Sequence, residues 1–230
     1  VGAVIGAEVL LRWQRPGSGL VTPDCFVPLC EATGLILPLG RWVLETACAQ
    51  LKQWTEQPLT QELQLAVNVS AMQFQQPDFV AQVCQNLHRQ GISPERLKLE
   101  LTESVVLGDI DSAVRKMQQL DALGVALSLD DFGTGYSSLT YLKRLPLKQL
   151  KIDQSFIRDI VQSPNGAAIV RAILAMSHSL GLQTLAEGVE TPEQCAFLKQ
   201  YECDACQGYL FGRPMPLTQF ETWLAQHVAA

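Results

Sequence analysis

The sequence predicts an α/β protein built on a parallel sheet. Short apolar runs of strand character alternate with longer helical patterns along all 230 residues, and this alternation is typical of βαβ units. Gly91, Gly124 and Gly181 each follow a helical pattern, at the position where capping glycines end helices. No linker, low-complexity tract or internal repeat interrupts the chain, so we expect one domain over residues 1–230. The pattern alone leaves an open sheet and a closed barrel as alternatives.

Seven runs have strand character, and the helical patterns lie between and after them. The expected strands are Ala3–Arg12, Leu63–Val69, Leu97–Leu101, Val125–Leu129, Gln149–Ile152, Gln183–Ala186 and Gln207–Phe211. The expected helices are Leu37–Trp54, Asp78–Gln90, Asp111–Leu123, Ser138–Arg144, Gly166–Leu180, Pro192–Tyr201 and Pro216–His227.

The composition excludes several classes of protein. Apolar residues make up 47% and charged residues 17%, which supports a large core and argues against intrinsic disorder. The 17 Lys and Arg against 23 Asp and Glu give a net charge of -6, without any basic run. We therefore expect no nucleic-acid polymer as a partner, and a phosphate ligand would need a metal ion or a few placed cations.

The cysteines and the apolar runs indicate a cytoplasmic protein. Seven cysteines are an odd number, and several lie in apolar patterns, which favours reduced thiols over a disulfide framework. Cys203 and Cys206 form a single CxxC motif without a second pair, so we favour two small core residues over a zinc or redox site. No apolar run reaches the ~20 residues of a membrane span, and no secretion signal is visible, so we expect no membrane contact from this chain.

Polar residues end one expected strand after another. They are Asn68, Glu100, Asp130 with Asp131, Lys151 followed by Asp153, Glu187 followed by Glu190, and Gln207, while Glu8 lies in the first strand. The carboxyl ends of parallel strands share one edge or one barrel mouth, so these side chains should face a common volume.

Such a group of carboxylates needs cations. The oxygen ligands Glu8, Asn68, Glu100, Asp130, Asp131 and Glu187 favour Mg²⁺ or Mn²⁺ over zinc. The adjacent pair Asp130-Asp131 would let one carboxylate bridge two ions, an arrangement that serves phosphoryl displacement. Lys151 would orient a water or stabilise charge on phosphorus. The alternative is a ring of strand-end salt bridges around Lys151, but one lysine cannot neutralise five carboxylates.

Three further features surround these strand ends. The glycine-spaced segment Asp131–Ser138 suits a mobile lid and lacks the pattern of a nucleotide P-loop. Arg12, four residues after Glu8 and expected on the same strand face, would contact phosphate or pair with a carboxylate such as Glu190. The three histidines are far apart in helical patterns, so we expect solvated or capping roles for them.

The same residues form a set of motifs that resembles the EAL domain, the cyclic-di-GMP phosphodiesterase module of bacterial signalling. The resemblance runs from about Gly2 to Pro216. Its motifs are Glu8-Val9-Leu10-Leu11-Arg12-Trp13, Asn68-Val69-Ser70, Glu100-Leu101-Thr102-Glu103, Asp130-Asp131-Phe132-Gly133, Lys151-Ile152-Asp153, Glu187-Gly188-Val189-Glu190 and Gln207-Gly208-Tyr209.

The resemblance implies a modified TIM (β/α)₈ barrel that hydrolyses cyclic di-GMP to linear 5′-pGpG with two Mg²⁺ or Mn²⁺ ions. By position, Glu8, Asn68, Glu100 and Asp130 resemble ligands of the first ion, and Asp130, Asp131 and Glu187 those of the second. Lys151 resembles the residue that steers the nucleophilic water, and Glu187 and Glu103 are also implied in catalysis, Glu103 by holding the lid loop. The implied contacts to substrate or its water network are Leu10, Arg12, Asn68, Asp131, Glu190 and Gln207.

Two departures from the family pattern affect what we expect. Val9 stands where the signature usually has alanine, and the added methyl groups should be tolerated with some repacking. Family members usually carry a helix and a strand ahead of the signature, and this sequence shows neither. We therefore expect the chain to be a fragment of a longer protein.

The resemblance also leaves alternatives for function and partners. A catalytically silent cyclic-di-GMP receptor and an interaction module are the alternatives to an active enzyme, but silent members typically lose the ligands that this sequence retains. We expect a homodimer through the barrel, with residues around Asp153 to Asp159 as a candidate surface, and sensory or GGDEF domains in the full-length protein, which could be membrane-tethered.

Overall fold

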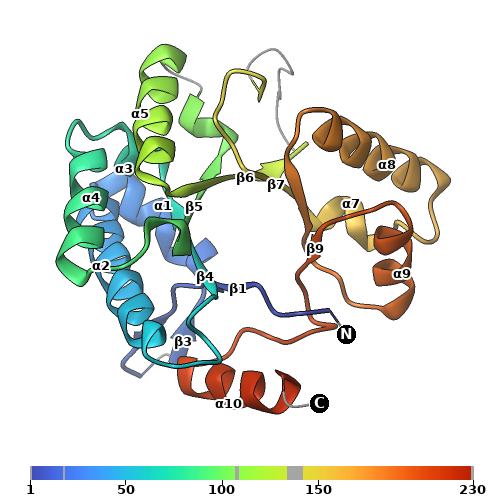
Figure 1. Cartoon of the computed structure of the whole chain (residues 1–230), viewed down its shortest axis with the longest axis horizontal. Coiled ribbons are helices and arrows are strands. Elements are labelled where there is room, and N and C mark those ends of the chain that lie inside the picture. Colours follow the sequence, from blue (N-terminus) through green and yellow to red (C-terminus); the bar gives the residue numbers. More distant parts are fainter. Residues whose placement is uncertain (1, 18, 107–108, 134–141, 229–230) are drawn as a thin grey trace. The chain divides into compact units, whose positions relative to one another are not determined.

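The computed structural model describes residues 2–17, 19–106, 109–133 and 142–228. The chain forms two compact units, one of Val1–Ala126 together with Glu221–Ala230 and one of Leu127–Phe220 (Figure 1). Each unit alternates parallel strands with helices, as the sequence predicts.

The first unit contains three neighbouring parallel strands, β1 (Gly6–Val9), β4 (Gln64–Val69) and β5 (Leu97–Thr102). In the strand register, Glu8 pairs with Ala66 and Asn68 pairs with Glu100. The polar residues at the carboxyl ends of these strands therefore lie along one edge of the first unit.

Helices cover these strands and supply most of the core of the first unit. α2 (Ile36–Thr55) packs against β4 and α4 (Phe79–Gln90), and α4 packs against α5 (Ile110–Leu123), so the helices stand side by side (Figure 1). α3 (Ala71–Gln75) and the 3₁₀ turns Pro94–Arg96 and Glu103–Val106 connect them. The side chains of Leu51, Trp54 and Leu99 are fully buried and belong to this core. A hydrogen bond connects α10 (Leu217–Val228) to α2, because Trp54 Nε1 donates to Glu221 Oε1 at 2.9 Å.

The second unit contains four neighbouring parallel strands, β6 (Ala126–Phe132, of which Ala126 belongs to the first unit), β7 (Gln149–Ile152), β8 (Gln183–Ala186) and β9 (Ala205–Cys206). α8 (Pro164–Ser179) packs against β7 and β8, with α7 (Gln154–Arg158) beside it. α9 (Pro192–Gln200) begins with a capping box between Thr191 and Gln194, which satisfies the first backbone N–H groups of the helix.

Most of the predicted elements are found where the sequence places them, and two strands differ. β1 is shorter than the predicted strand Ala3–Arg12, and the last strand lies at Ala205–Cys206 rather than at Gln207–Phe211. After β9 the chain turns, because Gly208 lies against the backbone of Val189 and the N–H of Leu210 donates to Val189 O. Of the predicted helix Ser138–Arg144, residues 138–141 lie outside the described residues.

A hairpin, the helix α1 (Pro23–Thr33) and the five-residue helix α3 of the first unit were not predicted. β2 (Trp13–Arg15) pairs antiparallel with β3 (Gly19–Val21), and α1 follows them. Both strands have only three residues, which is too short for a periodic signal. α1 carries Pro23 at its start, where proline is tolerated, and Pro28 inside, where proline hides a helical pattern.

Arg96 connects four parts of the first unit, and we expect its replacement to destabilise that unit. Its side chain is buried and donates to the carbonyl oxygens of Leu63 (3.2 Å), Leu51 (3.4 Å) and Thr60 (2.8 Å) and to Thr55 Oγ1 (2.8 Å). Arg96→Met should lower the free energy of unfolding by about 2–3 kcal/mol, because the buried acceptors lose their donors. Urea unfolding followed by circular dichroism measures this loss.

The matched control is Arg115→Met, on the exposed face of α5. This substitution should change the free energy of unfolding by less than about 0.5 kcal/mol. Equal losses in the two variants would show that the contacts of Arg96 do not stabilise the unit. Burial also lowers the pKa of Arg96, an effect that the charge of Glu62 opposes.

Candidate active site

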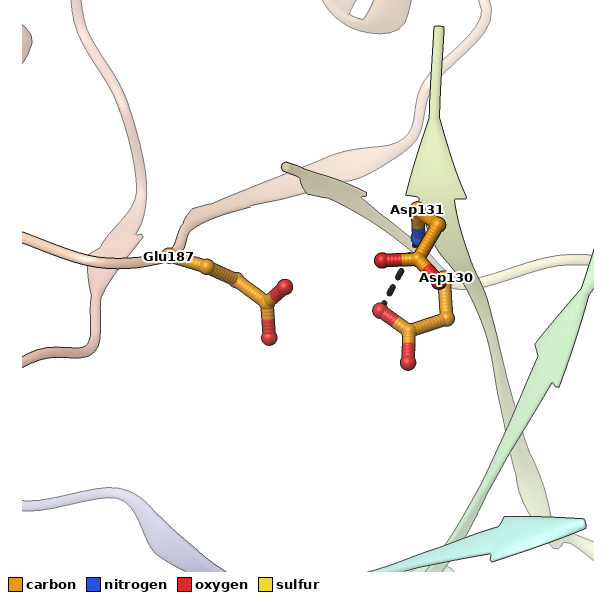
Figure 2. A group of neighbouring side chains, drawn as sticks. All are labelled: Asp130, Asp131 and Glu187. Carbon is orange, nitrogen blue, oxygen red and sulfur yellow. Dashed lines mark hydrogen bonds between the residues drawn. The ribbon is translucent and has the colours of Figure 1, made fainter. Parts of the chain in front are cut away.

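A bulge in β6 sets the geometry of the candidate site in the second unit. The pairing of β6 with β7 shifts register between Leu129 and Phe132, and Asp131 has a φ of 53°, in the left-handed region. In a regular strand two adjacent side chains point to opposite faces. Here Asp130 and Asp131 lie on one side, and Asp130 Oδ1 accepts the backbone N–H of Asp131 at 3.0 Å (Figure 2).

Lys151 and Glu187 complete this cluster from β7 and from the end of β8. Lys151 is only 1% exposed, and its Nζ lies 3.1 Å from Asp130 Oδ1 and 2.8 Å from Glu187 Oε1. Lys151 pairs with Leu185 in the strand register, so Glu187, two residues further on, reaches it from the strand end. Burying an ammonium group at this depth requires such paired carboxylates.

The three carboxylates form a group that could hold a cation. Asp130, Asp131 and Glu187 each offer an oxygen, and these oxygens lie within 4.8 Å of one another (Figure 2). Together with Lys151 they carry two net negative charges. An all-oxygen set of this kind suits Mg²⁺ or Mn²⁺, because hard cations take carboxylate ligands. The residues present therefore fit a hard divalent ion.

The first unit carries the other predicted ligands. Asn68 Nδ2 donates to Glu8 Oε1 at 2.6 Å, across the β1–β4 pair. Glu100 is 3% exposed and is the register partner of Asn68 on β5. The strand ends therefore bring Glu8, Asn68 and Glu100 to neighbouring positions, as the sequence analysis predicts.

The predicted positioning and substrate residues lie in segments that follow the strands. Leu10 follows β1 and is 39% exposed, and Glu103 opens the 3₁₀ turn after β5. Arg12 was predicted on the same strand face as Glu8, but β1 ends at Val9. Arg12 lies beyond it and donates from Nη1 to the carbonyl oxygen of Leu11 at 2.8 Å.

Glu190 and Gln207 both lie near the end of β8. Glu190 follows it closely in the sequence, and Gln207 is hydrogen-bonded to its last residue, Ala186. Gln207 donates its backbone N–H to Ala186 O at 2.8 Å and accepts from the N–H of Val189 at 3.0 Å. The backbone N–H of Glu190 donates to Gln194 Oε1 at 2.7 Å, while its side chain is exposed. Of the predicted lid Asp131–Ser138, residues 134–138 lie outside the described residues.

Two glycines, each next to a predicted site residue, shape the second unit and received no role from the sequence analysis. A Cβ on Gly188, whose φ is 66°, would lie 2.5 Å from Gln154 Cβ. A Cβ on Gly208 would lie 2.2 Å from the carbonyl oxygen of Val189. The close approaches fix the path of the backbone around Glu187 and Gln207. A glycine directly after a predicted site residue, here Glu187 or Gln207, is the sequence signal that could have revealed both.

A family model described as EAL domain matches residues 1–214. This chain belongs to the EAL domain family. The EAL domain here is 48% identical over 218 residues to the bifunctional diguanylate cyclase/cyclic di-GMP phosphodiesterase MucR of Pseudomonas aeruginosa, with 95% of this chain and 32% of MucR covered. It is 45% identical over 223 residues to the cyclic di-GMP phosphodiesterase NbdA of the same species, with 97% and 28% covered. The chain thus spans about a third or less of the length of these relatives.

Solved EAL structures share the fold of this chain. The phosphodiesterase PaMucR in its c-di-GMP complex superposes with a TM-score of 0.91 at 48% identity, covering 95% of this chain and 88% of the other. The EAL enzyme Bd1971, with cAMP and cyclic-di-GMP bound, gives 0.91 at 33% identity, covering 95% and 60%. These matches confirm the predicted α/β fold of the TIM-barrel-like EAL type. Within the described part of the chain, we find no helix with the length and apolar character of a membrane span.

Proposed function

We propose that this chain is a metal-dependent phosphodiesterase that hydrolyses cyclic di-GMP to linear 5′-pGpG. The observation that carries the proposal is the acidic cluster of Asp130, Asp131 and Glu187 around the buried Lys151. The similarity to MucR and NbdA, both named as cyclic di-GMP phosphodiesterases, supplies the substrate. The chain covers 32% of MucR and 28% of NbdA, and we propose the phosphodiesterase activity for this part alone.

The proposed metal ligands follow the strand ends of each unit. In the first unit they are Glu8, Asn68 and Glu100, and in the second Asp130, Asp131 and Glu187. When bound, Mg²⁺ or Mn²⁺ would supply a Lewis acid that activates water and offsets charge on the phosphodiester. We propose two ions per site.

The remaining roles belong to side chains of the protein. We propose that Lys151 orients the attacking water, because its ammonium group is fixed between Asp130 and Glu187 and has little freedom to move. Glu103 would act in catalysis as a positioning residue. Leu10, Arg12, Glu190 and Gln207 would contact the substrate or its water network, and Arg12 is the cation suited to a phosphate oxygen.

We further propose that residues 1–230 act as one EAL-type domain of a longer, cytoplasmic protein with sensory or GGDEF domains. MucR, whose name combines a cyclase and a phosphodiesterase, supports additional domains. A homodimer through the barrel is the proposed assembly. Seven free cysteines among the described residues agree with a reducing compartment.

Incubation of the chain with cyclic di-GMP and Mg²⁺ or Mn²⁺, followed by chromatography, tests the proposed reaction. We expect pGpG to accumulate and a chelator to stop its formation. Tight binding of cyclic di-GMP without any pGpG, at any concentration of either metal, would instead identify a receptor. The absence of both binding and product would exclude the two functions together.

A further inference from the structure

β9 is the shortest strand in the described part of the chain, and a proposed substrate residue follows it directly. Its two residues, Ala205 and Cys206, pair in parallel with Leu185 and Ala186 of β8, and Gln207 comes next. Strands in globular proteins usually have three residues or more, because fewer backbone hydrogen bonds hold a register weakly. The position of Gln207 therefore depends on what fixes the two ends of β9.

Backbone contacts fix the carboxyl end of β9. Gln207 donates its N–H to Ala186 O at 2.8 Å and accepts the N–H of Val189 at 3.0 Å. Gly208 lies against the same segment, where an added Cβ would be 2.2 Å from the carbonyl oxygen of Val189. These contacts hold Gln207 beside the backbone that carries Glu187, as long as β9 keeps its register against β8.

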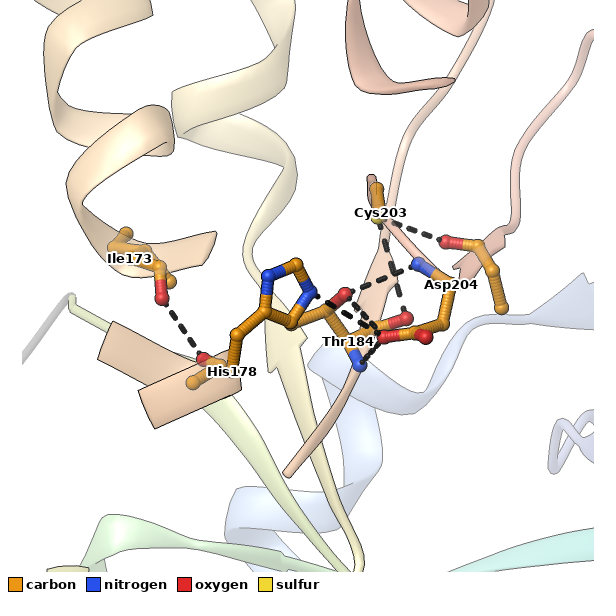
Figure 3. A network of polar contacts seen from close by, with 7 residues as sticks. Ile173, His178, Thr184, Cys203 and Asp204 are labelled. Carbon is orange, nitrogen blue, oxygen red and sulfur yellow. Dashed lines mark hydrogen bonds and ion pairs between the residues drawn. The ribbon is translucent and has the colours of Figure 1, made fainter. Parts of the chain in front are cut away.

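A side-chain pair between Asp204 and Thr184 fixes the amino end of β9 (Figure 3). Asp204 Oδ2 accepts both the backbone N–H and the hydroxyl of Thr184, each at 2.8 Å. Thr184 Oγ1 in turn accepts the backbone N–H of Asp204 at 3.1 Å. Thr184 is 0% exposed, so its hydroxyl depends on this partner. Three hydrogen bonds thus join the residue before β9 to the second residue of β8.

This pair of side chains fits one register of the two strands. Ala205 lies opposite Leu185, which places Asp204 opposite Thr184. A slip of one residue would bring Asp204 opposite Gln183 or Leu185, neither of which has a hydroxyl. The buried Thr184 hydroxyl would then lose its partner, which is unfavourable because a buried polar group keeps its full desolvation penalty.

Two neighbouring side chains contribute little to the contact between Asp204 and Thr184. His178 Nε2 lies 3.9 Å from Asp204 Oδ2, which is too long for a hydrogen bond. Cys203 Sγ lies 3.2 Å from Ala205 O, and thiols are weak donors. The sequence analysis favoured small core residues at Cys203 and Cys206, and both are half-buried.

Glu187 has supports that do not involve β9. Its backbone N–H donates to Ile152 O at 3.0 Å, and its Oε1 lies 2.8 Å from Lys151 Nζ. Both partners belong to β7. A shift of β9 should therefore move Gln207 and leave Glu187 in place.

We propose that Asp204 and Thr184 are positioning residues that set the register of β9 and so place Gln207 for its contact with cyclic di-GMP. The link to substrate rests on the proposed function, whereas the register of β9 does not. The pair acts on substrate binding and not on metal binding, because Gln207 is a proposed substrate contact and Glu187 is a proposed metal ligand.

Thr184→Val tests the proposal, because valine keeps the shape of threonine and removes the hydroxyl. We expect the KM for cyclic di-GMP to rise about tenfold, while kcat and the affinity for Mn²⁺ stay within about twofold. Thr184→Ser keeps the hydroxyl and should restore KM. Asp204→Ala should behave like Thr184→Val, and Asp204→Asn serves if Thr184→Val does not fold.

Hydrogen–deuterium exchange at the backbone N–H of Gln207 measures the register of β9 without catalysis. This N–H donates to Ala186 O, so it should exchange at least about tenfold faster in Thr184→Val. Ser177→Ala is the matched control. It removes another fully buried hydroxyl, which donates to Ile173 O at 2.9 Å inside α8, and it should change neither the exchange nor KM.

Three results would overturn the proposal. They are unchanged exchange at Gln207 in Thr184→Val, faster exchange with an unchanged KM, and a loss of Mn²⁺ affinity equal to the loss of substrate affinity. If the unchanged protein binds cyclic di-GMP without turnover, its dissociation constant replaces KM, so failure of the phosphodiesterase activity stays distinct from failure of this proposal. If it binds no cyclic di-GMP, the role of Gln207 is excluded, and the exchange rates still decide whether the pair sets the register.

Discussion

Asp131→Asn should remove nearly all cyclic-di-GMP hydrolysis while the protein stays folded. Asp131 is exposed and its φ of 53° suits asparagine, which adopts the left-handed region more readily than most residues. The substitution removes one of three carboxylates whose oxygens lie within 4.8 Å of one another. A loss of about 4 kcal/mol of electrostatic stabilisation corresponds to roughly 10³-fold in kcat.

The affinity for Mn²⁺ tests the role of the Asp131 carboxylate as a ligand independently of turnover. Isothermal titration should show that Asp131→Asn binds Mn²⁺ at least about 100-fold more weakly. Loss of a residue that only hydrogen-bonds to a metal ligand has a smaller effect, about 10- to 100-fold. Asp130→Asn should behave alike, with a further loss of stability because Asp130 pairs with Lys151. Glu193→Gln, an exposed acid on α9, is the matched control and should leave both quantities unchanged. Unchanged Mn²⁺ affinity in Asp131→Asn would exclude this carboxylate as a ligand.

The strand ends of the candidate site could be predicted because parallel strands with short connections align their carboxyl ends. A polar residue that ends an apolar run, such as Asn68 or Glu100, must then lie at the shared edge. This placement does not depend on the pairing register of the other strands. Lys151 was predicted as a cation among carboxylates by charge alone, and its contacts with Asp130 and Glu187 agree. This inference needed only the order of the strands.

The remaining features depend on interactions that no local pattern encodes. The bulge that turns Asp131 to the side of Asp130 comes from the pairing of β6 with β7. The end of β9 is set by Gly208 against Val189, a contact between segments about twenty residues apart. The apolar run of the first strand continues through Leu10 and Leu11 to Arg12, but the pairing of β1 with β4 ends at Val9. The length of this strand therefore could not be predicted from hydropathy.

Lys151→Met should destabilise the metal-free protein more than other substitutions at the site. The lysine is 1% exposed, and its removal takes away a cation within 3.1 Å of Asp130 and 2.8 Å of Glu187. Breaking a buried ion pair from one side costs about 3–5 kcal/mol, because the charges that remain are no longer compensated. Thermal and urea unfolding in a chelator measure the loss. Lys199→Met, at an exposed position on α9, should change the free energy of unfolding by less than about 0.5 kcal/mol.

Added Mn²⁺ separates the structural role of Lys151 from its proposed role in catalysis. A divalent cation bound by Asp130, Asp131 and Glu187 replaces the missing positive charge, so at 100 times its Kd it should restore about 2.7 kcal/mol of stability. Turnover should stay roughly 10²–10³-fold below that of the unchanged protein, because the ion does not reproduce a fixed donor that orients water. If Mn²⁺ restored stability and turnover together, Lys151 would be only a counter-ion of the acidic cluster. If Mn²⁺ restored stability but not turnover, Lys151 would have a role in catalysis beyond charge balance. The metal ion would then balance the charge of the carboxylates, while only the lysine orients the water.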